Sequence, residues 1–483
     1  MSSALLSPPD SVAGDRELVL ALQGVTALDR AGELAAGGRG GPDAVQRQYD
    51  LARDLEESVV AAEPVNDGCR ALARVLRSLA RAHVRQAEGV DRKISSVVKA
   101  GLDQAAIARQ GLADARARCR PRQPAPTREQ MRQLLEPAPG DAFFGDVTAV
   151  APPGADTAEV LVNGTRWGDR ISVRGRIFRV RLAGRPRKCD VEVRFFDSTG
   201  ALVSSARADG VWLLERASAR AKAAGRRSPE LSASLTAVAQ AFEGHVAAYR
   251  LNLLTGVYGA WNADAKFPAA SLVKVGVMLA AVERLGARPD RSKLAYDLAA
   301  MTTWSSNLAA NRLLGKLGGP AAIERLFRRL GALGSTYPGP YRVGTSISIP
   351  EFTRLDAPDP PPRVSARTTT AADMARLLWL VHAGATGNGS ALTTLRLGKH
   401  QARYALGLLL SSKATGENVA LFRRALDKRT PLAQKNGWLQ DARHTAAIVY
   451  RRGLPEIVVV LIYKRGLALA EAERVGARML SAG

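Results

Sequence analysis

The chain reads Phe267-Pro-Ala-Ala-Ser271-Leu-Val-Lys274 just past its midpoint and then continues into an apolar run. The apolar residues from Val275 to Leu279 predict a helix that begins near the serine. Residues three positions apart share one face of a helix, so we expect the Lys274 amine to reach the Ser271 hydroxyl. A helix N-terminus also favours developing negative charge, which suits a serine that becomes acylated.

This spacing alone is not specific, because Ser96-Val-Val-Lys99 repeats it near the front of the chain without supporting context. Two later stretches distinguish Ser271, namely Ser305-Ser306-Asn307 and Lys435-Asn436-Gly437. They follow in the order used by serine enzymes that carry the motifs S-x-x-K, S-D-N and K-T-G. Together the three stretches supply a nucleophilic hydroxyl, two amines, a second hydroxyl and an amide.

On these motifs the chain from about residue 228 to its end resembles the class A β-lactamases and the wider family of penicillin-recognising serine hydrolases. Further similar stretches lie at 267–268, 307–311, 317–320 and 368–375. The resemblance implies an α+β fold similar to β-lactamases and transpeptidases, in which a sheet is flanked by helices and accompanied by an all-helical lobe.

The resemblance also implies a role for each motif residue. Ser271 would attack the substrate carbonyl, Lys274 would act as or help to form the general base, and Ser305 would relay a proton to the leaving nitrogen. Lys435 would place a positive charge opposite the substrate carboxylate. The substrate-binding set would comprise Asn307, Gly437, Trp438 and Arg443. The backbone N–H groups of Ser271 and Trp438 would form an oxyanion hole, and either Arg443 or His444 would meet the carboxylate.

The second and third motifs depart from the family pattern. Ser306 stands where the family has Asp, and Asn436 stands where it has Thr or Ser, which removes an expected hydroxyl contact to the substrate carboxylate. Ser305 follows Ser271 by 34 positions, a shorter stretch than in typical β-lactamases. This predicts that one wall of the substrate cleft is reduced and that the cleft is wider. A wider cleft favours a bulky substrate such as a peptide stem, and the alternative is that no substrate is bound tightly.

The glutamate that activates the deacylating water in this family has no clear counterpart between Thr336 and Thr368. Asp359 and Glu351 are weak candidates for that base, because exposed loop carboxylates are usually only solvated. Three hypotheses therefore stand. The chain is a β-lactam hydrolase, a D-alanyl-D-alanine peptidase-like enzyme, or a wall-binding protein whose hydrolase domain is weakly active or relic.

The chain is long enough for two or three domains. We expect a helical region over 1–130, a small β-sandwich-like domain over 140–220 and the hydrolase domain over 225–483. Apolar spacing between about 42 and 120 predicts two or three helices, and the proline-rich run 120–126 is typical of a linker. Farther on, Val191, Val193 and Phe195 alternate with polar residues, which predicts antiparallel strands.

Lys and Arg number 69 against 45 Asp and Glu, a net charge of +24 that favours an anionic partner such as a cell-wall polymer. No recognition motif accompanies the charge, so no specific nucleic-acid partner is expected. Arginines on the expected β domain would face either such a polymer or only solvent. They are Arg174, Arg176, Arg179 and Arg181.

Three cysteines do not make a disulfide scaffold. If the segments 70–87 and 91–117 form an antiparallel helical hairpin, Cys69 and Cys119 fall at its open end, where a disulfide would join them. Buried or free thiols are the alternative. The five histidines show no metal-ligand spacing, so we expect neither a metal nor a cofactor.

No run of about 20 apolar residues predicts a transmembrane segment. The residues after Met1 also lack the charged start and apolar core of a signal peptide. Because the family acts on β-lactams or on peptidoglycan stem peptides, a periplasmic or extracellular location is nonetheless what the resemblance implies.

Overall fold

The computed structural model describes residues 18, 21–37, 41–62, 67–119, 134–219, 222–286, 289–343, 366–412 and 420–483. The chain divides into two compact units. The first comprises Met1–Gln130 together with the short segments Ser306–Arg312 and Tyr341–Ile347. The second comprises Met131–Ser305, Leu313–Pro340 and Ser348–Gly483. The expected linker at 120–126 lies outside the described residues.

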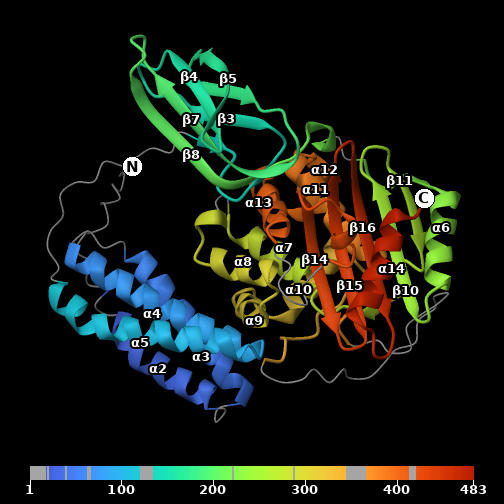
Figure 1. Cartoon of the computed structure of the whole chain (residues 1–483), viewed down its shortest axis with the longest axis horizontal. Coiled ribbons are helices and arrows are strands. Elements are labelled where there is room, and N and C mark those ends of the chain that lie inside the picture. The colour runs from blue at the N-terminus through green and yellow to red at the C-terminus, as the bar shows by residue number, and fades with distance from the viewer. Residues whose placement is uncertain are drawn as a thin grey trace, which may run out of the picture. The chain divides into compact units, whose positions relative to one another are not determined.

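Helices build the first unit (Figure 1). Those described are α2 (Gln23–Ala36), α3 (Gly41–Ala61), α4 (Asp67–Asp91) and α5 (Ser95–Arg118). Leu72, Leu76 and Leu79 are fully buried on one face of α4, at the spacing that predicted a helix there. The two or three helices expected after residue 42 are α3, α4 and α5, and α2 lies before them within the expected helical region.

A disulfide joins Cys69, near the start of α4, to Cys119, directly after α5. Between its two helices the chain turns within residues 92–94. The bond therefore lies at the open end of an antiparallel hairpin. The helices approach closely, because a Cβ atom added to Gly101 would lie 2.9 Å from the backbone oxygen of Ala82.

The segment Ser306–Arg312 belongs to the first unit although it is remote from the other helices in sequence. The hydroxyl of Ser306 donates a hydrogen bond to the buried carboxylate of Glu88. The side chain of Arg312 is only 3% exposed, and its Nη2 atom lies 2.8 Å from Asp54 Oδ1 and 2.7 Å from Glu57 Oε1. Charged groups of the front helices thus hold this segment.

The second unit begins with two small β-sheets. Their strands are β1 (Leu134–Glu136), β2 (Ala142–Phe143), β3 (Asp146–Val150), β4 (Thr157–Val162), β5 (Thr165–Ser172), β6 (Ile177–Arg181), β7 (Arg187–Phe196) and β8 (Leu202–Leu213). Their orders are β1-β3-β6 and β2-β8-β7-β4-β5, antiparallel except for β2 with β8. Asn163-Gly164, both with positive φ, forms the two-residue turn between β4 and β5. Val147, Phe178 and Val193 join one core from both sheets, which is sandwich-like packing.

The basic residues of this β region remain at the surface. The four arginines named above, Arg174, Arg176, Arg179 and Arg181, are all exposed. One of them forms an ion pair, because Arg181 Nε lies 3.1 Å from Asp146 Oδ1.

A mixed six-stranded sheet forms the centre of the remaining part. It is built from β9 (Arg226–Arg227), β10 (His245–Asn252), β11 (Val257–Trp261), β14 (Leu432–Leu439), β15 (Ala442–Arg451) and β16 (Leu454–Tyr463), in the order β14-β15-β16-β10-β11-β9. Only β9 and β11 are parallel. One face packs on α6 (Pro229–Gln240) and α14 (Leu469–Ser481) through residues such as Leu235, Val460 and Met479. Strands β15 and β16 and helix α14 are the last elements of the chain.

A lobe made of helices completes the α+β architecture (Figure 1). A short strand pair accompanies these helices. These elements are β12 (Phe267–Pro268), α7 (Lys274–Arg284), α8 (Ala295–Thr303), α10 (Pro320–Leu330), β13 (Thr368–Thr369), α11 (Ala371–Thr386), α12 (Gly389–Leu395) and α13 (Lys399–Leu410). Helix α9 (Asn307–Lys316) is divided between the units, because its residues up to Arg312 belong to the first. Within the described ranges, no helix combines the length and the apolar content that a bilayer crossing requires.

Candidate active site

Ser271 lies in a tight turn immediately before α7. Successive backbone hydrogen bonds of the i to i+3 type join Ala269 to Leu272 and Ser271 to Lys274. Ala270 has a φ of +48°, a conformation that a residue with a side chain adopts only at some cost. The helix thus begins at Lys274 rather than at the serine, and backbone strain is stored directly beside the candidate nucleophile.

The amine of Lys274 is directed to Ser305. It donates to the backbone oxygen of Ser305 at 2.6 Å and lies 3.4 Å from the Ser305 hydroxyl. Lys274 is fully buried near the start of an apolar helix. Within the part of the chain that the structure describes, the Ser271 hydroxyl has no hydrogen-bond partner. Catalytic hydrogen bonds are often incomplete before substrate binds.

Lys435 approaches the same hydroxyl from strand β14. Its Nζ atom donates to Ser305 Oγ at 2.9 Å and to the backbone oxygen of Asn436 at the same distance. Ser305 itself has a φ of +66°, so the backbone after α8 is held in a left-handed conformation that presents this side chain. Three of the predicted catalytic residues, Lys274, Ser305 and Lys435, therefore meet at one hydroxyl group.

Burial controls the charge of Lys435. The side chain is 1% exposed, and desolvation lowers its pKa from the usual 10.5 to about 7. The group consequently titrates near neutral pH, where small changes in its surroundings switch it between an ammonium ion and a neutral amine. A lysine with such a pKa is a candidate functional group, because an ordinary surface lysine is charged throughout this range.

Gly437 brings strand β14 against the turn that carries Ser271. A Cβ atom at this position would lie 2.8 Å from the backbone oxygen of Ala269 and 3.2 Å from the backbone nitrogen of Leu272. Both contacts are with backbone atoms, which cannot rotate away. The glycine of the third motif therefore has a steric role, which is to let the strand approach the nucleophile turn.

We expect Gly437→Ala to slow acylation of the protein by at least about tenfold, because the strand and the turn must separate and small displacements of reacting groups are costly. The rate of labelling by a fluorescent penicillin measures the effect. Gly389→Ala is the matched control, since a Cβ atom there meets nothing within 4 Å. Equal rates for the two variants would contradict the steric role.

Neighbouring residues of β14 and β15 face the other side of the sheet. Asn436 pairs with Thr445 across the strands, and its Oδ1 atom accepts a hydrogen bond from the Thr445 hydroxyl at 2.8 Å. Trp438 pairs with Arg443, whose guanidinium lies 4.7 Å from the indole ring. Arg443 also donates to the backbone oxygen of Leu467. These contacts do not bring Arg443 or the Trp438 side chain to the hydroxyl of Ser305.

His444 is a buried structural residue, which corrects the expectation that it meets a substrate carboxylate. It is 0% exposed; its Nε2–H donates to the backbone oxygen of Pro268 at 2.7 Å, and its Nδ1 accepts from the N–H of Ile462. Burial lowers its pKa to about 4, so the ring is neutral at physiological pH. Sequence reasoning missed this tether between β15 and the strand before the nucleophile turn, since no pattern indicates a contact over such a separation.

The remaining residues predicted for the site are Asn307 and the two candidate deacylating residues. The boundary between the two compact units falls inside the second motif, so Ser305 belongs to the second unit, whereas Ser306 and Asn307 belong to the first. Asn307 is the first residue of α9. The candidate deacylating residues Glu351 and Asp359 lie outside the described residues. Among the residues that are described, no cluster of His, Cys, Asp or Glu is arranged to hold a metal ion.

Comparisons with known proteins bear on the second half of the chain. Residues 230–294 and 289–479, together just over half of the sequence, match the profile described as "Beta-lactamase enzyme family". No curated protein matches the chain.

Several solved structures are similar to the chain. The structure of PBP-A shares 17% identity, with a TM-score of 0.42 over 54% of this chain and 97% of that one. A β-lactamase from Streptosporangium roseum shares 20%, with a TM-score of 0.41 over 53% and 98% of the two chains. A β-lactamase from Xanthomonas campestris shares 18%, with a TM-score of 0.41 over 52% and 94%.

Proposed function

Because the chain belongs to the β-lactamase enzyme family, we propose that it is a serine hydrolase that opens a β-lactam or a related amide through an acyl-enzyme at Ser271. One observation carries the proposal. The Ser305 hydroxyl lies 3.4 Å from the amine of Lys274 and 2.9 Å from that of Lys435. A hydroxyl placed between two buried amines is suited to moving a proton.

In the proposed acylation the Ser271 oxygen attacks the carbonyl carbon, and its proton passes to the amine of Lys274, which acts as the general base. The carbon–nitrogen bond then breaks, and the proton moves through Ser305 to the leaving nitrogen. The backbone N–H groups of Ser271 and Trp438 would bind the oxyanion, and removal of one such donor costs about 2.7–4 kcal/mol in other serine enzymes. The product is an ester between Ser271 and the acyl group.

Lys435 is proposed to supply positive charge to this reaction. An ammonium ion beside Ser305 favours transfer of the hydroxyl proton to the leaving nitrogen and attracts the carboxylate of a penicillin or a stem peptide. Asn307 and Gly437 remain the proposed contacts to the rest of the substrate, whereas Arg443, on the other face of the sheet, is no longer proposed as one. Gly437 has the firmest structural support among them, because its backbone lies against the nucleophile turn.

Deacylation requires water to attack the Ser271 ester and a base to accept the proton from that water. Asp359 and Glu351 remain proposals for this base. Slow hydrolysis of the ester formed from a β-lactam would make the protein a penicillin-binding peptidase-like enzyme, whereas fast hydrolysis of that ester would make it a β-lactamase. The two activities share the acylation step described above.

Intact-mass measurement after incubation with a panel of lactams tests the proposal. We expect wild type to gain the mass of one lactam and Ser271→Ala to gain none. No adduct on wild type, together with no hydrolysis of a chromogenic cephalosporin, would refute acylation, and so would an equal adduct on Ser271→Ala. Release of D-alanine from a stem pentapeptide, compared with cephalosporin hydrolysis, then distinguishes the peptidase from the β-lactamase.

The disulfide between Cys69 and Cys119 supports a location outside the reducing cytosol. Disulfides persist mainly in oxidising compartments such as the periplasm and the extracellular space. This agrees with a substrate that belongs to the cell wall. We therefore propose a periplasmic or extracellular location, which fractionation of cells that express the full chain would test.

A further inference from the structure

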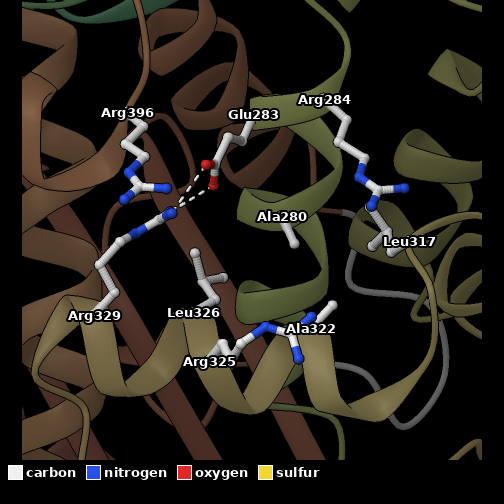
Figure 2. A pocket seen from close by; sticks show the side chains of 9 residues that line it. All are labelled: Ala280, Glu283, Arg284, Leu317, Ala322, Arg325, Leu326, Arg329 and Arg396. Atoms are coloured by element: carbon white, nitrogen blue, oxygen red, sulfur yellow. Dashed lines mark hydrogen bonds and ion pairs between the residues drawn. The ribbon is translucent and has the colours of Figure 1, made fainter.

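A cavity of about 540 Å³, called here the arginine-lined cavity, lies between α7 and α10 in the helical lobe. Figure 2 shows it from close by: Arg329 and Arg396 lie beside Glu283, Arg325 lies farther along α10, and Arg284 lies on the opposite side of α7. The volume is within the range of small-molecule sites. The cavity is separate from the candidate active site, because Lys274 is at the first turn of α7, whereas the cavity is lined by the last turn of that helix.

Positive charge dominates the cavity. Arg284, Arg325, Arg329 and Arg396 line it, and Glu283 is the one acidic residue among its lining residues. Glu283 is already neutralised, because both of its oxygens are bound by the guanidinium of Arg329 (Figure 2). That bidentate pair fixes Arg329, whose Nε atom is buried without a partner in the described part of the chain.

The position of Arg396 is a second indication that the cavity binds a ligand. Arg396 ends α12 with a φ of +56°, in the left-handed conformation that helix ends usually assign to glycine. The same lobe follows that rule at the ends of α10 and α11, where Gly331 and Gly387 have this conformation. Arginine at the third such site carries a conformational cost, and its side chain lines the cavity.

We propose that this cavity is a binding site for an anion that carries two linked phosphoryl groups. Guanidinium groups bind phosphate oxygens in pairs of parallel hydrogen bonds, and four arginines are among the residues that line this cavity. Four positive charges face one paired negative charge, which matches a multivalent anion better than a single carboxylate. Arg284 is held in place by a 2.8 Å hydrogen bond to the backbone oxygen of Lys316. The site is therefore partly preorganised, which lowers the entropic cost of binding.

Titration calorimetry of the full chain with inorganic pyrophosphate tests this proposal, with single-site binding as the expected result. Arg325→Gln should weaken the affinity roughly ten- to hundred-fold, as expected when a charge-assisted hydrogen bond is lost. Arg328→Gln is the matched control, because it removes the same charge from an exposed position of the same helix that does not line the cavity. Equal weakening in both variants would mean non-specific attraction to a basic protein and would overturn the proposal.

Two further measurements sharpen the test. Arg396→Gly should weaken pyrophosphate binding while raising the melting temperature, because it removes a guanidinium and also relieves the left-handed strain. A binding loss of this kind cannot be attributed to unfolding. Citrate carries comparable charge on carboxylates, so it should bind much more weakly than pyrophosphate. Equal affinity for citrate, unchanged affinity in Arg396→Gly or no binding of pyrophosphate would each refute a phosphoryl site.

Discussion

Lys435→Met is expected to slow acylation of Ser271 by at least about a hundredfold while leaving the protein folded. The Lys435 amine is one of the two that contact the Ser305 hydroxyl, at 2.9 Å, and methionine fills similar space without a charge or a donor. The rate of covalent labelling by a penicillin measures the effect. Lys428→Met is the control, because Lys428 is exposed in the segment that precedes the same strand.

The wild-type rate should also depend on pH in a defined direction. Lys435 is charged below its pKa of about 7 and neutral above it. If its ammonium form is required, the second-order rate constant for acylation falls about tenfold for each pH unit above 7. This fall in the acylation rate constant above pH 7 should be absent from Lys435→Met. A wild-type rate that instead rises through pH 7 would show that the neutral amine is the active form and would contradict the proposed electrostatic role.

The pKa of Lys435 also predicts how Lys435→Met affects stability, which allows a loss of activity to be distinguished from a loss of folding. The pKa of Lys435 is about 7 in the folded protein and 10.5 in an unfolded chain, so the folded state binds this proton more weakly. Stability is therefore lost as the pH falls from 10.5 towards 7. Methionine removes that cost, so the melting temperature of Lys435→Met at pH 7 should not fall. A large fall would attribute the lost activity to unfolding.

Arg250→Ala is expected to lower the free energy of unfolding by about 3–5 kcal/mol, as is typical when one partner of a buried ion pair is removed. Arg250 on β10 is 9% exposed and Glu456 on β16 is 3% exposed, and Arg250 Nη2 lies 2.8 Å from the carboxylate. The guanidinium also donates to the backbone oxygen of Ala482, directly after α14. Its loss would release the last helix from the sheet and leave the Glu456 carboxylate with a weaker set of partners.

Urea denaturation at pH 7 measures this change. Arg452→Ala is the matched control, because Arg452 is 75% exposed and its Nε atom lies 4.0 Å from the carboxylate of Glu215. Exposed pairs of this kind contribute at most about 1 kcal/mol. Similar losses for the two variants would show that burial of the Arg250 pair has no special importance.

Local sequence patterns predicted the helices and strands in which the spacing of apolar residues indicates the buried face. Alternation at Val191 to Phe195 predicted a strand, and helical spacing around Leu72 to Leu79 predicted a helix, because burial of one face follows directly from such periods. The motif order also predicted that Lys274, Ser305 and Lys435 would meet. That inference rested on resemblance to a family, since spacing alone selects Ser96 and Lys99 equally well.

Contacts over long separations were beyond these patterns. Nothing near Ser306 indicates that its hydroxyl binds Glu88, which lies 218 positions earlier in the chain. The arginines of the arginine-lined cavity are spaced along two helices and a helix end, so in the sequence they resemble ordinary solvated charges. Secondary-structure periods fix which face of an element is buried, but they carry no information about which other element covers it.

The placement of Arg312 has a practical consequence for dissecting this protein. Arg312 falls within the stretch that matches the family profile, yet carboxylates from residues 54 and 57 surround its guanidinium. Expression of the family-like half alone would discard those acids and leave a cation without compensation inside the truncated product. Boundaries drawn from homology would thus cut through the first compact unit, to which both Arg312 and these acids belong, and any recombinant fragment that begins near residue 225 should be judged by its solubility before its activity is interpreted.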